Sequence, residues 1–368
     1  MVKVLYITDS LKVRFGVTSV IKNYIGHIHN ENIHIDILAY DDSEQAVIDE
    51  LKTYGVNIYF MPKLSFKTIF KFISFIKSFF KHNKYQIVHS HFNQIDSMVF
   101  PIAKKYGVKH CISHSHSSKN SDYLLRAFRN YIMCSSLPYL ADTWAACSDV
   151  AGIFLFGKNF KNSKKKLIIN NAIKVNKFVF NKSIRKTLRN SFDLSDDEIV
   201  IGMVGSIKPV KNHVFFLNVF KKLLEKSNKY RLIIVGDGEL KKEIELKSNN
   251  LKIIDKIIFT GIRQDVNNLL QAFDIFVLPS LYEGLPVSAV EAQANGLPCL
   301  LSDKITKEVD VVNTRYLSID NVNEWIEEIL LTKCDNRQDC SQKIINAGFD
   351  ITTEAQKLAN FYLKISNE

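Results

Sequence analysis

The chain has 368 residues, of which 46% are hydrophobic and 24% charged, and its formal net charge is +11. This length favours two domains, and the absence of an uncharged apolar run of about 18 residues argues against a membrane-spanning helix. Six cysteines are scattered without CxxC or paired histidine spacing, which argues against a zinc site or a disulfide framework and is typical of reduced cytosolic thiols.

The N-terminal half alternates short apolar runs with amphipathic segments, starting from MVKVLYITDS, which has a strand pattern and lacks the features of a signal peptide. Its expected strands are Val2–Thr8, Ile33–Ala39, Val56–Met61, Gln86–His89, Lys109–Ser113 and Asp142–Ala146. Amphipathic helices are expected between them, for example at Thr18–Ile28 and Ile95–Tyr106. This alternation predicts a parallel sheet covered by helices.

A polar, basic stretch over 170–193 separates this half from a second series of the same kind. The strands expected there are Ile199–Val204, Leu232–Val235, Ile257–Thr260, Asp274–Leu278 and Pro298–Leu301. The sequence therefore predicts an α/β protein with two Rossmann-like, doubly wound domains facing a cleft, and ligands at the carboxyl ends of the strands. The last segment, Thr353–Ile365, has a helical pattern.

The excess positive charge lies entirely in residues 1–180, which hold 24 lysines and arginines against 12 aspartates and glutamates. Such asymmetry favours an acidic partner: an anionic lipid, a phosphorylated substrate or nucleic acid. No nucleic-acid-binding module is recognisable, so nucleic acid is not expected. The segment Ser65–Lys84 combines a lysine and serine stripe with a broad Phe/Ile face. That face either lies on an anionic membrane or covers the sheet.

The most informative segment is 274–298, DIFVLPSLYEGLPVSAVEAQANGLP. An apolar strand is followed by a turn containing Glu283, and a helix expected to begin near Leu285 contains Glu291. Between the two carboxylates lie the free N–H groups of the helix start, which favour an anion. This layout suits a nucleotide sugar: one carboxylate meets sugar hydroxyls, the amides meet the diphosphate, and the second carboxylate meets the ribose diol.

With its E-G-L-P and A-x-G-x-P surroundings, this segment resembles the family 4 retaining glycosyltransferases of the GT-B fold, of the type found in bacterial capsular and exopolysaccharide biosynthesis. The resemblance implies an acceptor-binding domain (1–175), a nucleotide-sugar-binding domain (176–350) and a C-terminal helix (351–368) crossing back to the first domain. It implies hexosyl transfer from a nucleotide diphosphate sugar, expected to be UDP-linked, to a lipid-linked saccharide. The location would be cytoplasmic, peripheral on the inner face of the cell membrane.

Two alternatives share this architecture, a nucleotide-sugar epimerase and a non-catalytic binding subunit. The epimerase converts a UDP-sugar without an acceptor, and the binding subunit turns over no donor. The resemblance implies no cofactor and no metal, because lysine and helix dipoles supply the positive field around the diphosphate.

The resemblance also assigns roles in the second half. Glu283 would contact the donor sugar, Glu291 the ribose, and Lys211 the diphosphate together with the amides near Leu285 and Val287. Ser206 stands where family members usually carry an arginine, which removes a charge-assisted fork from the phosphate site.

The turn containing Ile262 and Arg263 is similar to the family turn that faces the nucleobase. In the first half, Gly16 keeps the second position of a glycine pair beside the diphosphate, and Phe15 occupies the first position.

Two histidine motifs end neighbouring strands, His89-Ser90-His91 and His114-Ser115-His116. From the residues alone they are either a metal site, because H-x-H on a strand places both rings on one face, or hydrogen-bonded histidines of a polar cleft. The family resemblance places His114 against the donor sugar as a catalytic residue, and His116 and His91 on the acceptor side.

Overall fold

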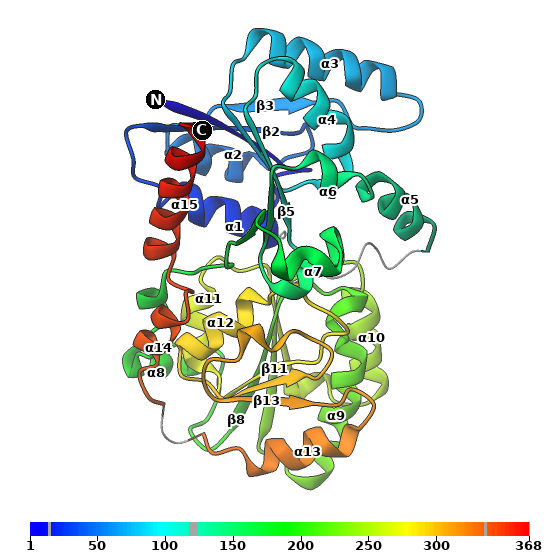
Figure 1. Ribbon diagram of the computed structural model, residues 1–368. Coiled ribbons are helices and arrows are strands. Elements are labelled where there is room, and N and C mark those ends of the chain that lie inside the picture. The colour runs from blue at the N-terminus through cyan, green and yellow to red at the C-terminus, as the bar shows by residue number, and fades with distance from the viewer. Residues whose placement is uncertain (14–15, 118–123, 335–336, 368) are drawn as a thin grey trace. The chain divides into compact units, whose positions relative to one another are not determined.

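The computed structural model describes residues 1–13, 16–117, 124–334 and 337–367. The chain forms two compact units: residues 1–172 with 351–368, and residues 173–350. Each unit is built around a parallel sheet (Figure 1). The predicted class, two Rossmann-like α/β domains, is confirmed.

The N-terminal unit has a seven-stranded sheet in the order β3-β2-β1-β4-β5-β6-β7, and all its pairs are parallel. Its strands are β1 Val2–Ile7, β2 Ile33–Tyr40, β3 Ile58–Met61, β4 Ile87–Ser90, β5 His110–Ser115, β6 Thr143–Ala146 and β7 Lys166–Ile168. Its helices are α1 Gly16–Ile25, α2 Gln45–Lys52, α3 Ile69–His82, α4 Asn93–Lys105, α5 Leu124–Cys134, α6 Leu137–Leu140, α7 Asp149–Phe156, η1 Lys158–Asn162 and α15 Ile351–Ser366.

The C-terminal unit has a six-stranded parallel sheet in the order β10-β9-β8-β11-β12-β13. Its strands are β8 Ile199–Val204, β9 Tyr230–Val235, β10 Ile257–Gly261, β11 Ile275–Leu278, β12 Cys299–Ser302 and β13 Thr314–Leu317. Its helices are α8 Lys182–Ser191, α9 His213–Lys226, α10 Lys241–Asn250, α11 Val266–Ala272, α12 Val287–Ala294, α13 Val322–Leu331 and α14 Ser341–Asn346. Its short 3₁₀ turns are η2 Val175–Lys177, η3 Pro209–Lys211, η4 Ile254–Lys256 and η5 Lys307–Val309.

The strands β7 and β13 are not predicted from the sequence, and each lies at one edge of its sheet. β7 is a three-residue strand at the end of a lysine run, and β13 (TRYL) mixes polar and apolar residues. Edge strands need neither length nor two buried faces, so an apolar-run criterion does not find them.

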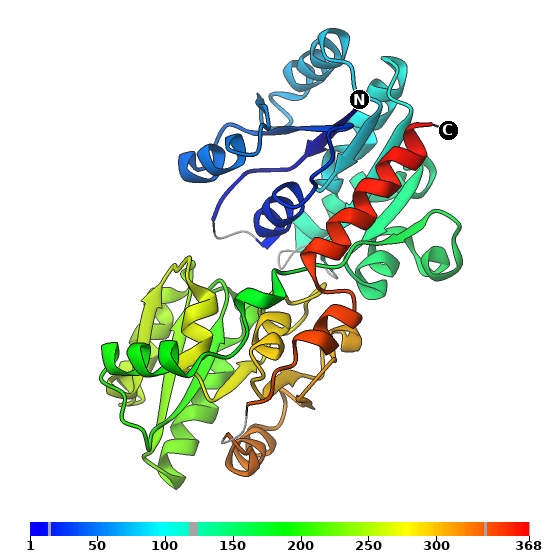
Figure 2. The same cartoon turned by 90° about the vertical axis from the view of Figure 1, so that its left-hand side faces the viewer.

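The C-terminal helix α15 belongs to the N-terminal unit, although it follows the whole C-terminal unit in the sequence (Figure 2). It runs beside α1 and contributes one face to that unit's hydrophobic core. The buried residues of this face are Ile351, Ala355, Leu358, Ala359, Tyr362 and Ile365. Their spacing of about one helical turn explains the position of the helix, because only one stripe of it is apolar.

The Phe/Ile face of α3 covers the sheet of its own unit, which was one of the two alternatives for the segment Ser65–Lys84. Its buried members are Phe72, Ile76, Phe79 and Phe80. The opposite face is exposed, and Phe66 and Phe70 at its start are 97% and 85% accessible. Among the described residues, no helix has the length and apolar character needed to cross a membrane.

Two arginines of the basic segment before β8 stabilise the fold of the C-terminal unit. Arg185 and Arg189 of α8 both reach the carboxylate of Asp274, at 2.6 and 3.0 Å, at the start of β11. Asp274 also accepts a hydrogen bond from Val200 N in β8. Arg189 and Asp274 are 2% and 5% exposed. A shared buried carboxylate therefore ties the first helix of the C-terminal unit to its two central strands.

Replacing Asp274 by asparagine should destabilise the C-terminal unit strongly, because it leaves two guanidinium groups facing a neutral amide. We expect the free energy of unfolding, measured by urea denaturation, to fall by about 3–5 kcal/mol. The control is Asp303→Asn, which removes an exposed pair with Lys304 and should cost about 0–1 kcal/mol. Equal losses in both variants would contradict the anchoring role of Asp274.

Candidate functional site

Four loops meet at the carboxyl edge of the C-terminal sheet. Backbone hydrogen bonds join Gly205 N to Val235 O (3.0 Å), Gly236 N to Gly261 O (2.9 Å) and Leu281 N to Val210 O (2.8 Å). The loops after β8, β9, β10 and β11 are therefore fastened to one another. This is the edge at which open parallel sheets bind ligands.

Two glycines make this close packing possible. A Cβ added to Gly236 would lie 2.0 Å from the carbonyl oxygen of Gly205, a distance no side chain can occupy. Both residues have positive φ angles, 135° at Gly236 and 149° at Gly205. The strand-ending glycine Gly205 thus permits loop-to-loop contact.

Lys211 and Glu283, from different loops of this edge, form a short ion pair. Lys211 Nζ lies 2.6 Å from Glu283 Oε1, and the two side chains are 14% and 15% exposed. The lysine stem passes Gly205, since a Cβ there would lie 3.1 Å from Lys211 Cε. The residue predicted to bind phosphate, Lys211, and the residue predicted to bind the sugar, Glu283, therefore contact each other.

The helix that carries Glu291 begins two residues later than the sequence predicted. α12 starts at Val287 after Pro286 as N-cap, and Leu285 is a buried loop residue, 5% exposed. Helix-start amides have no partner inside the helix, so Val287 and Ser288 supply the N–H groups of an anion site. Leu285 shapes the approach to that site as part of the loop.

Glu291 lies within α12 and carries no hydrogen bond to its carboxylate from the part of the chain that the structure describes. Burial raises its pKa from 4.5 to about 8. A carboxyl group in such surroundings favours a ligand that brings hydroxyl donors, because those donors would stabilise the charged form.

The two predicted nucleobase residues behave differently from each other. Arg263 is held by a two-pronged contact with Asp265, at 2.7 Å for both bonds, whereas Ile262 is 51% exposed beside Gly261. The geometry keeps Ile262 available for an apolar contact and positions Arg263 through its carboxylate partner.

Ser206 lies in the loop after β8, directly after Gly205. The backbone N–H of Ile207 in the same loop donates a hydrogen bond to Asp237 O at 3.0 Å, which holds this loop in place.

In the N-terminal unit, the four predicted histidines form one stacked cluster at the ends of β4 and β5. His89 Nε2 lies 3.2 Å from His114 Nδ1, and His91 Nδ1 lies 2.8 Å from His116 Nε2. The rings of His114 and His116 stack with centroids 4.0 Å apart. The sequence placed these residues on neighbouring strands, and the structure brings all four into contact.

Burial lowers the pKa of every ring in this cluster, to about 3 for His89 and about 4 for His116, and well below the ordinary value for His91 and His114. The four imidazoles are therefore neutral at physiological pH. Among the described residues, His89, His91 and His114 form a group that could hold a metal ion, with one ligand atom from each within 4.8 Å of the others. The expectation of no metal stays a prediction.

Gly16 is the first residue of α1 and is exposed. A Cβ built on it would have no neighbour within 4 Å, so the backbone there is open to a ligand. Phe15, which replaces the first glycine of the family's pair, lies outside the described residues.

Three polar side chains at these sites were not found from the sequence. Ser280 Oγ and His213 Nδ1 are buried in the C-terminal unit without a hydrogen-bond partner in the described chain. Tyr362 of α15 contacts His89 in the N-terminal unit through a 2.5 Å hydrogen bond. No local pattern reveals the last contact, because the partners are 273 residues apart.

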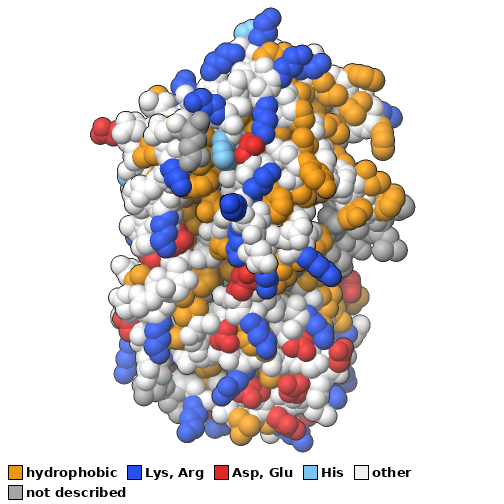
Figure 3. All heavy atoms as spheres, in the orientation of Figure 1, with side chains coloured by type: hydrophobic (Ala, Val, Ile, Leu, Met, Phe, Trp, Pro, Cys, Tyr) orange, Lys and Arg blue, Asp and Glu red, His pale blue; other side chains and the backbone are white. Residues whose placement is uncertain are grey.

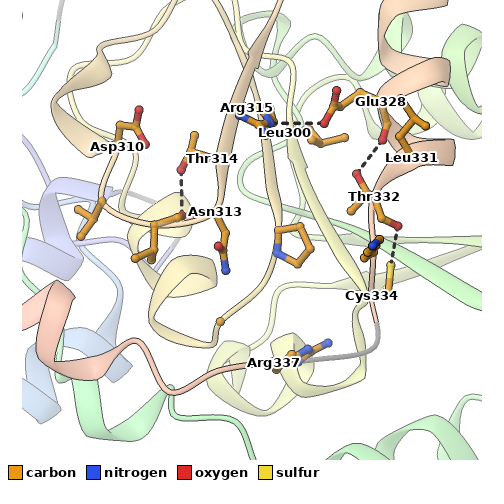
Figure 4. Close-up of a pocket in the computed structure, with 15 residues that line it drawn as sticks. Leu300, Asp310, Asn313, Thr314, Arg315, Glu328, Leu331, Thr332, Cys334 and Arg337 are labelled. Atoms are coloured by element: carbon orange, nitrogen blue, oxygen red, sulfur yellow. Dashed lines mark hydrogen bonds and ion pairs between the residues drawn. The ribbon is translucent and has the colours of Figure 1, made fainter.

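A hollow in the C-terminal unit lies at the opposite edge of its sheet, at the amino ends of β12 and β13 (Figure 4). Its wall includes Arg315 beside Glu328, and Arg337. It holds none of the residues predicted for the donor, and ligands of such sheets bind at the carboxyl edge. We therefore place the candidate site in the loops around Lys211 and Glu283.

Residues 184–346 match the family described as "Glycosyl transferases group 1". A putative glycosyltransferase of Bacillus subtilis, EpsF, is 28% identical over 380 residues, covering 100% of this chain and 97% of that protein. The Escherichia coli enzyme named UDP-Gal:alpha-D-GlcNAc-diphosphoundecaprenol alpha-1,3-galactosyltransferase is 26% identical and covers 91% of this chain and 90% of its own. Further matches bear names of O-antigen and capsular polysaccharide glycosyltransferases.

Among solved structures, Anabaena Alr3699/HepE in complex with UDP and glucose superimposes with a TM-score of 0.79 at 16% identity, over 98% of this chain and 99% of that one. The fold is thus GT-B, and the protein is a glycosyltransferase. These matches support the resemblance to the family 4 glycosyltransferases that the sequence indicated, and they place the protein among the glycosyltransferases of polysaccharide biosynthesis.

The raised pKa of Glu291 makes the stability of the C-terminal unit depend on pH. Between pH 4.5 and about 8 the folded protein keeps a proton that the unfolded chain has released, so the free energy of unfolding falls as pH rises through this window. The penalty is absent below pH 4.5 and complete above about pH 8, where it amounts to about 5 kcal/mol at most.

Glu291→Gln carries no such proton, so its stability relative to wild type should rise steadily between pH 4.5 and about 8. Urea denaturation at a series of pH values measures this difference. Glu243→Gln, at an exposed position of α10, serves as the control and should run parallel to wild type. A pH-independent difference between Glu291→Gln and wild type would contradict the buried, protonated carboxyl group.

Proposed function

We propose that the protein is a retaining glycosyltransferase that moves a sugar from a UDP-sugar to a lipid-linked saccharide. The observation that carries this proposal is the arrangement at one sheet edge of Lys211, Glu283, the first amides of α12 and Glu291. This order of cation, carboxylate, N–H groups and carboxylate suits a diphosphate between a sugar and a ribose.

In the proposed complex the diphosphate replaces Glu283 as the ion-pair partner of Lys211. The lysine and the amides of Val287 and Ser288 neutralise the charge that grows on the leaving diphosphate. Glu283, released from the lysine, accepts hydrogen bonds from hydroxyls of the donor sugar, and Glu291 accepts them from the ribose. Retention of configuration follows when the departing phosphate oxygen assists deprotonation of an acceptor on the same face of the sugar.

Two observations on similar proteins support the choice of donor and acceptor. HepE, whose fold this chain shares, was crystallised with UDP and glucose and with UDP-glucose. The Escherichia coli relative is named for a UDP-galactose donor and a diphosphoundecaprenol-linked acceptor. At the strand ends of the N-terminal unit, His114 would contact the transferred sugar, and His116 and His91 would contact the acceptor.

The exposed face of α3 supports a membrane-bound acceptor. This helix and the residues flanking it expose Phe66 and Phe70 together with the lysines Lys67, Lys71, Lys77, Lys81 and Lys84. Figure 3 shows basic and apolar side chains gathered over the part of the N-terminal unit that holds α3 and α5. Lysines next to exposed aromatic rings fit an anionic lipid surface, on the inner face of the cell membrane.

Binding of UDP-glucose as a probe tests the donor site through the two partners of the ion pair. Lys211→Met should weaken binding about tenfold to a hundredfold, because a charge-assisted contact to the diphosphate is lost. Glu283→Gln should bind UDP itself more tightly than wild type, since it frees Lys211, yet should transfer no sugar. Isothermal titration calorimetry measures the binding of UDP-glucose to Lys211→Met and of UDP to Glu283→Gln.

Lys222→Met, an exposed lysine of α9, is the matched control and should bind as wild type does. Weaker UDP binding in both Lys211→Met and Glu283→Gln would make the pair merely structural and would contradict the proposal. A product assay with and without acceptor, read by the anomeric configuration, separates transfer with retention from inversion and from epimerisation of the donor.

Membrane binding is tested with vesicles containing phosphatidylglycerol and with pure phosphatidylcholine vesicles. We expect binding to the first kind only. Each lysine contributes about 1 kcal/mol near an anionic surface, so Lys67→Ala with Lys71→Ala should weaken binding roughly thirtyfold in a sedimentation assay. Lys221→Ala with Lys222→Ala, on α9 of the other unit, should leave it unchanged. Equal losses in the two pairs would contradict a specific role of α3.

A further inference from the structure

A chain of four buried side chains links the C-terminal helix to the histidine cluster. Tyr6 of β1 lies 2.7 Å from Tyr362 of α15, oxygen to oxygen, and Tyr362 Oη lies 2.5 Å from His89 Nδ1 of β4. The other ring nitrogen of His89 lies 3.2 Å from His114 Nδ1 of β5. All four residues are at most 1% exposed, and all belong to the N-terminal unit.

Such a chain has a direction, because each hydrogen bond holds one proton. In the first direction, Tyr6 donates to Tyr362, Tyr362 donates to His89 Nδ1, and His89 Nε2–H donates to His114 Nδ1. The proton of neutral His114 then resides on Nε2. In the opposite direction, His114 Nδ1–H starts the chain and Tyr6 ends it.

Counting buried polar groups separates the two directions. Tyr362 is the one partner of the Tyr6 hydroxyl within the described chain, and His114 Nε2 has no partner there. The first direction leaves a single group unpaired, the N–H at His114 Nε2. The opposite direction leaves two, the Tyr6 O–H and a bare His114 Nε2. Each unpaired buried polar group costs about 1–3 kcal/mol, so the first direction is favoured.

The charges of the cluster agree with this proton count. Burial raises the pKa of both tyrosines far above the physiological range, so each keeps its hydroxyl proton. Burial lowers the pKa of all four imidazoles, so each ring carries a single proton. His89 and His114 each carry one ring proton. The hydrogen bonds of the chain can therefore run in only one direction at a time.

We infer that Tyr362 is a positioning residue that fixes His114 as the tautomer protonated on Nε2, so that His114 offers an N–H group to an oxygen of a sugar ligand. This inference rests on the proposed function for its ligand, whereas the tautomer is a property of the free protein. A neutral imidazole N–H binds a hydroxyl oxygen without adding charge beside the reacting carbon.

The same assignment competes with metal binding at the cluster. A metal ion binds the bare nitrogen of a neutral imidazole, so a metal on His114 Nε2 requires the opposite tautomer. The proton on Nε2 therefore keeps this nitrogen of His114 from binding a metal ion.

The test reads the tautomers directly by nuclear magnetic resonance on the full chain with isotope-labelled histidine. Wild type should show His89 and His114 protonated on Nε2 alone. Tyr362→Phe removes the donor to His89 and should shift both rings to a mixture of tautomers. The matched control is Tyr6→Phe, a buried tyrosine at the other end of the chain, which leaves Tyr362 with His89 as its acceptor and should keep the wild-type tautomers.

Several results would overturn the inference. His114 protonated on Nδ1 in wild type, unchanged tautomers in Tyr362→Phe, or switched tautomers in Tyr6→Phe each contradict the direction of the chain. So does added Zn²⁺ that binds stoichiometrically and replaces the Nε2–H signal of His114. These signals do not depend on nucleotide binding, so they stand apart from the donor-site experiments above.

Sugar transfer gives the second readout. Tyr362→Phe should lower kcat at least tenfold while the Kd for UDP, which lacks the sugar, stays at the wild-type value. Tyr6→Phe should change neither quantity by more than about twofold, although both variants lose one buried hydroxyl. Equal losses of kcat in the two variants would assign the effect to stability rather than to the tautomer of His114.

Discussion

The candidate site of the C-terminal unit depends on the ion pair between Lys211 and Glu283. It joins the loop after β8 to the loop after β11, two strands that are neighbours in the sheet. The pair holds both side chains in place. Under the proposed function, such a pair would lower the ordering cost of binding, because the diphosphate would replace one partner of an already fixed cation.

The sequence was a good guide wherever a residue's position follows from local periodicity. Apolar runs located eleven of the thirteen strands, and parallel topology then placed the ends of β8 and β11, with Lys211 and Glu283, at one edge. The start of α12 was predicted two residues early, because Leu285 is apolar and Pro286 serves as N-cap instead of occupying the first helical position. The contact of Arg263 with Asp265 could not be predicted either, because it depends on the rotamers that the two side chains adopt.

The histidine cluster shows the limit of such reading more clearly. The sequence indicated that four imidazoles end two strands, and left metal binding and hydrogen bonding open. The structure pairs the rings and adds Tyr362, which comes from a helix more than 270 residues away from His89. Contacts between elements so distant in sequence depend on how a helix face meets a sheet, and no local pattern encodes that. Burial keeps this cluster neutral.

The position of α15 has a consequence for the order in which the protein folds during synthesis. Domains generally fold as units while the chain leaves the ribosome, the N-terminal one first. Here the N-terminal unit lacks the last of its core-forming elements until residues 351–366 emerge, after the whole C-terminal unit has been translated. The helix that closes this core also brings Tyr362 to His89, so nascent chains that stop short of it contain Lys211 and Glu283 but lack the hydroxyl partner of His89.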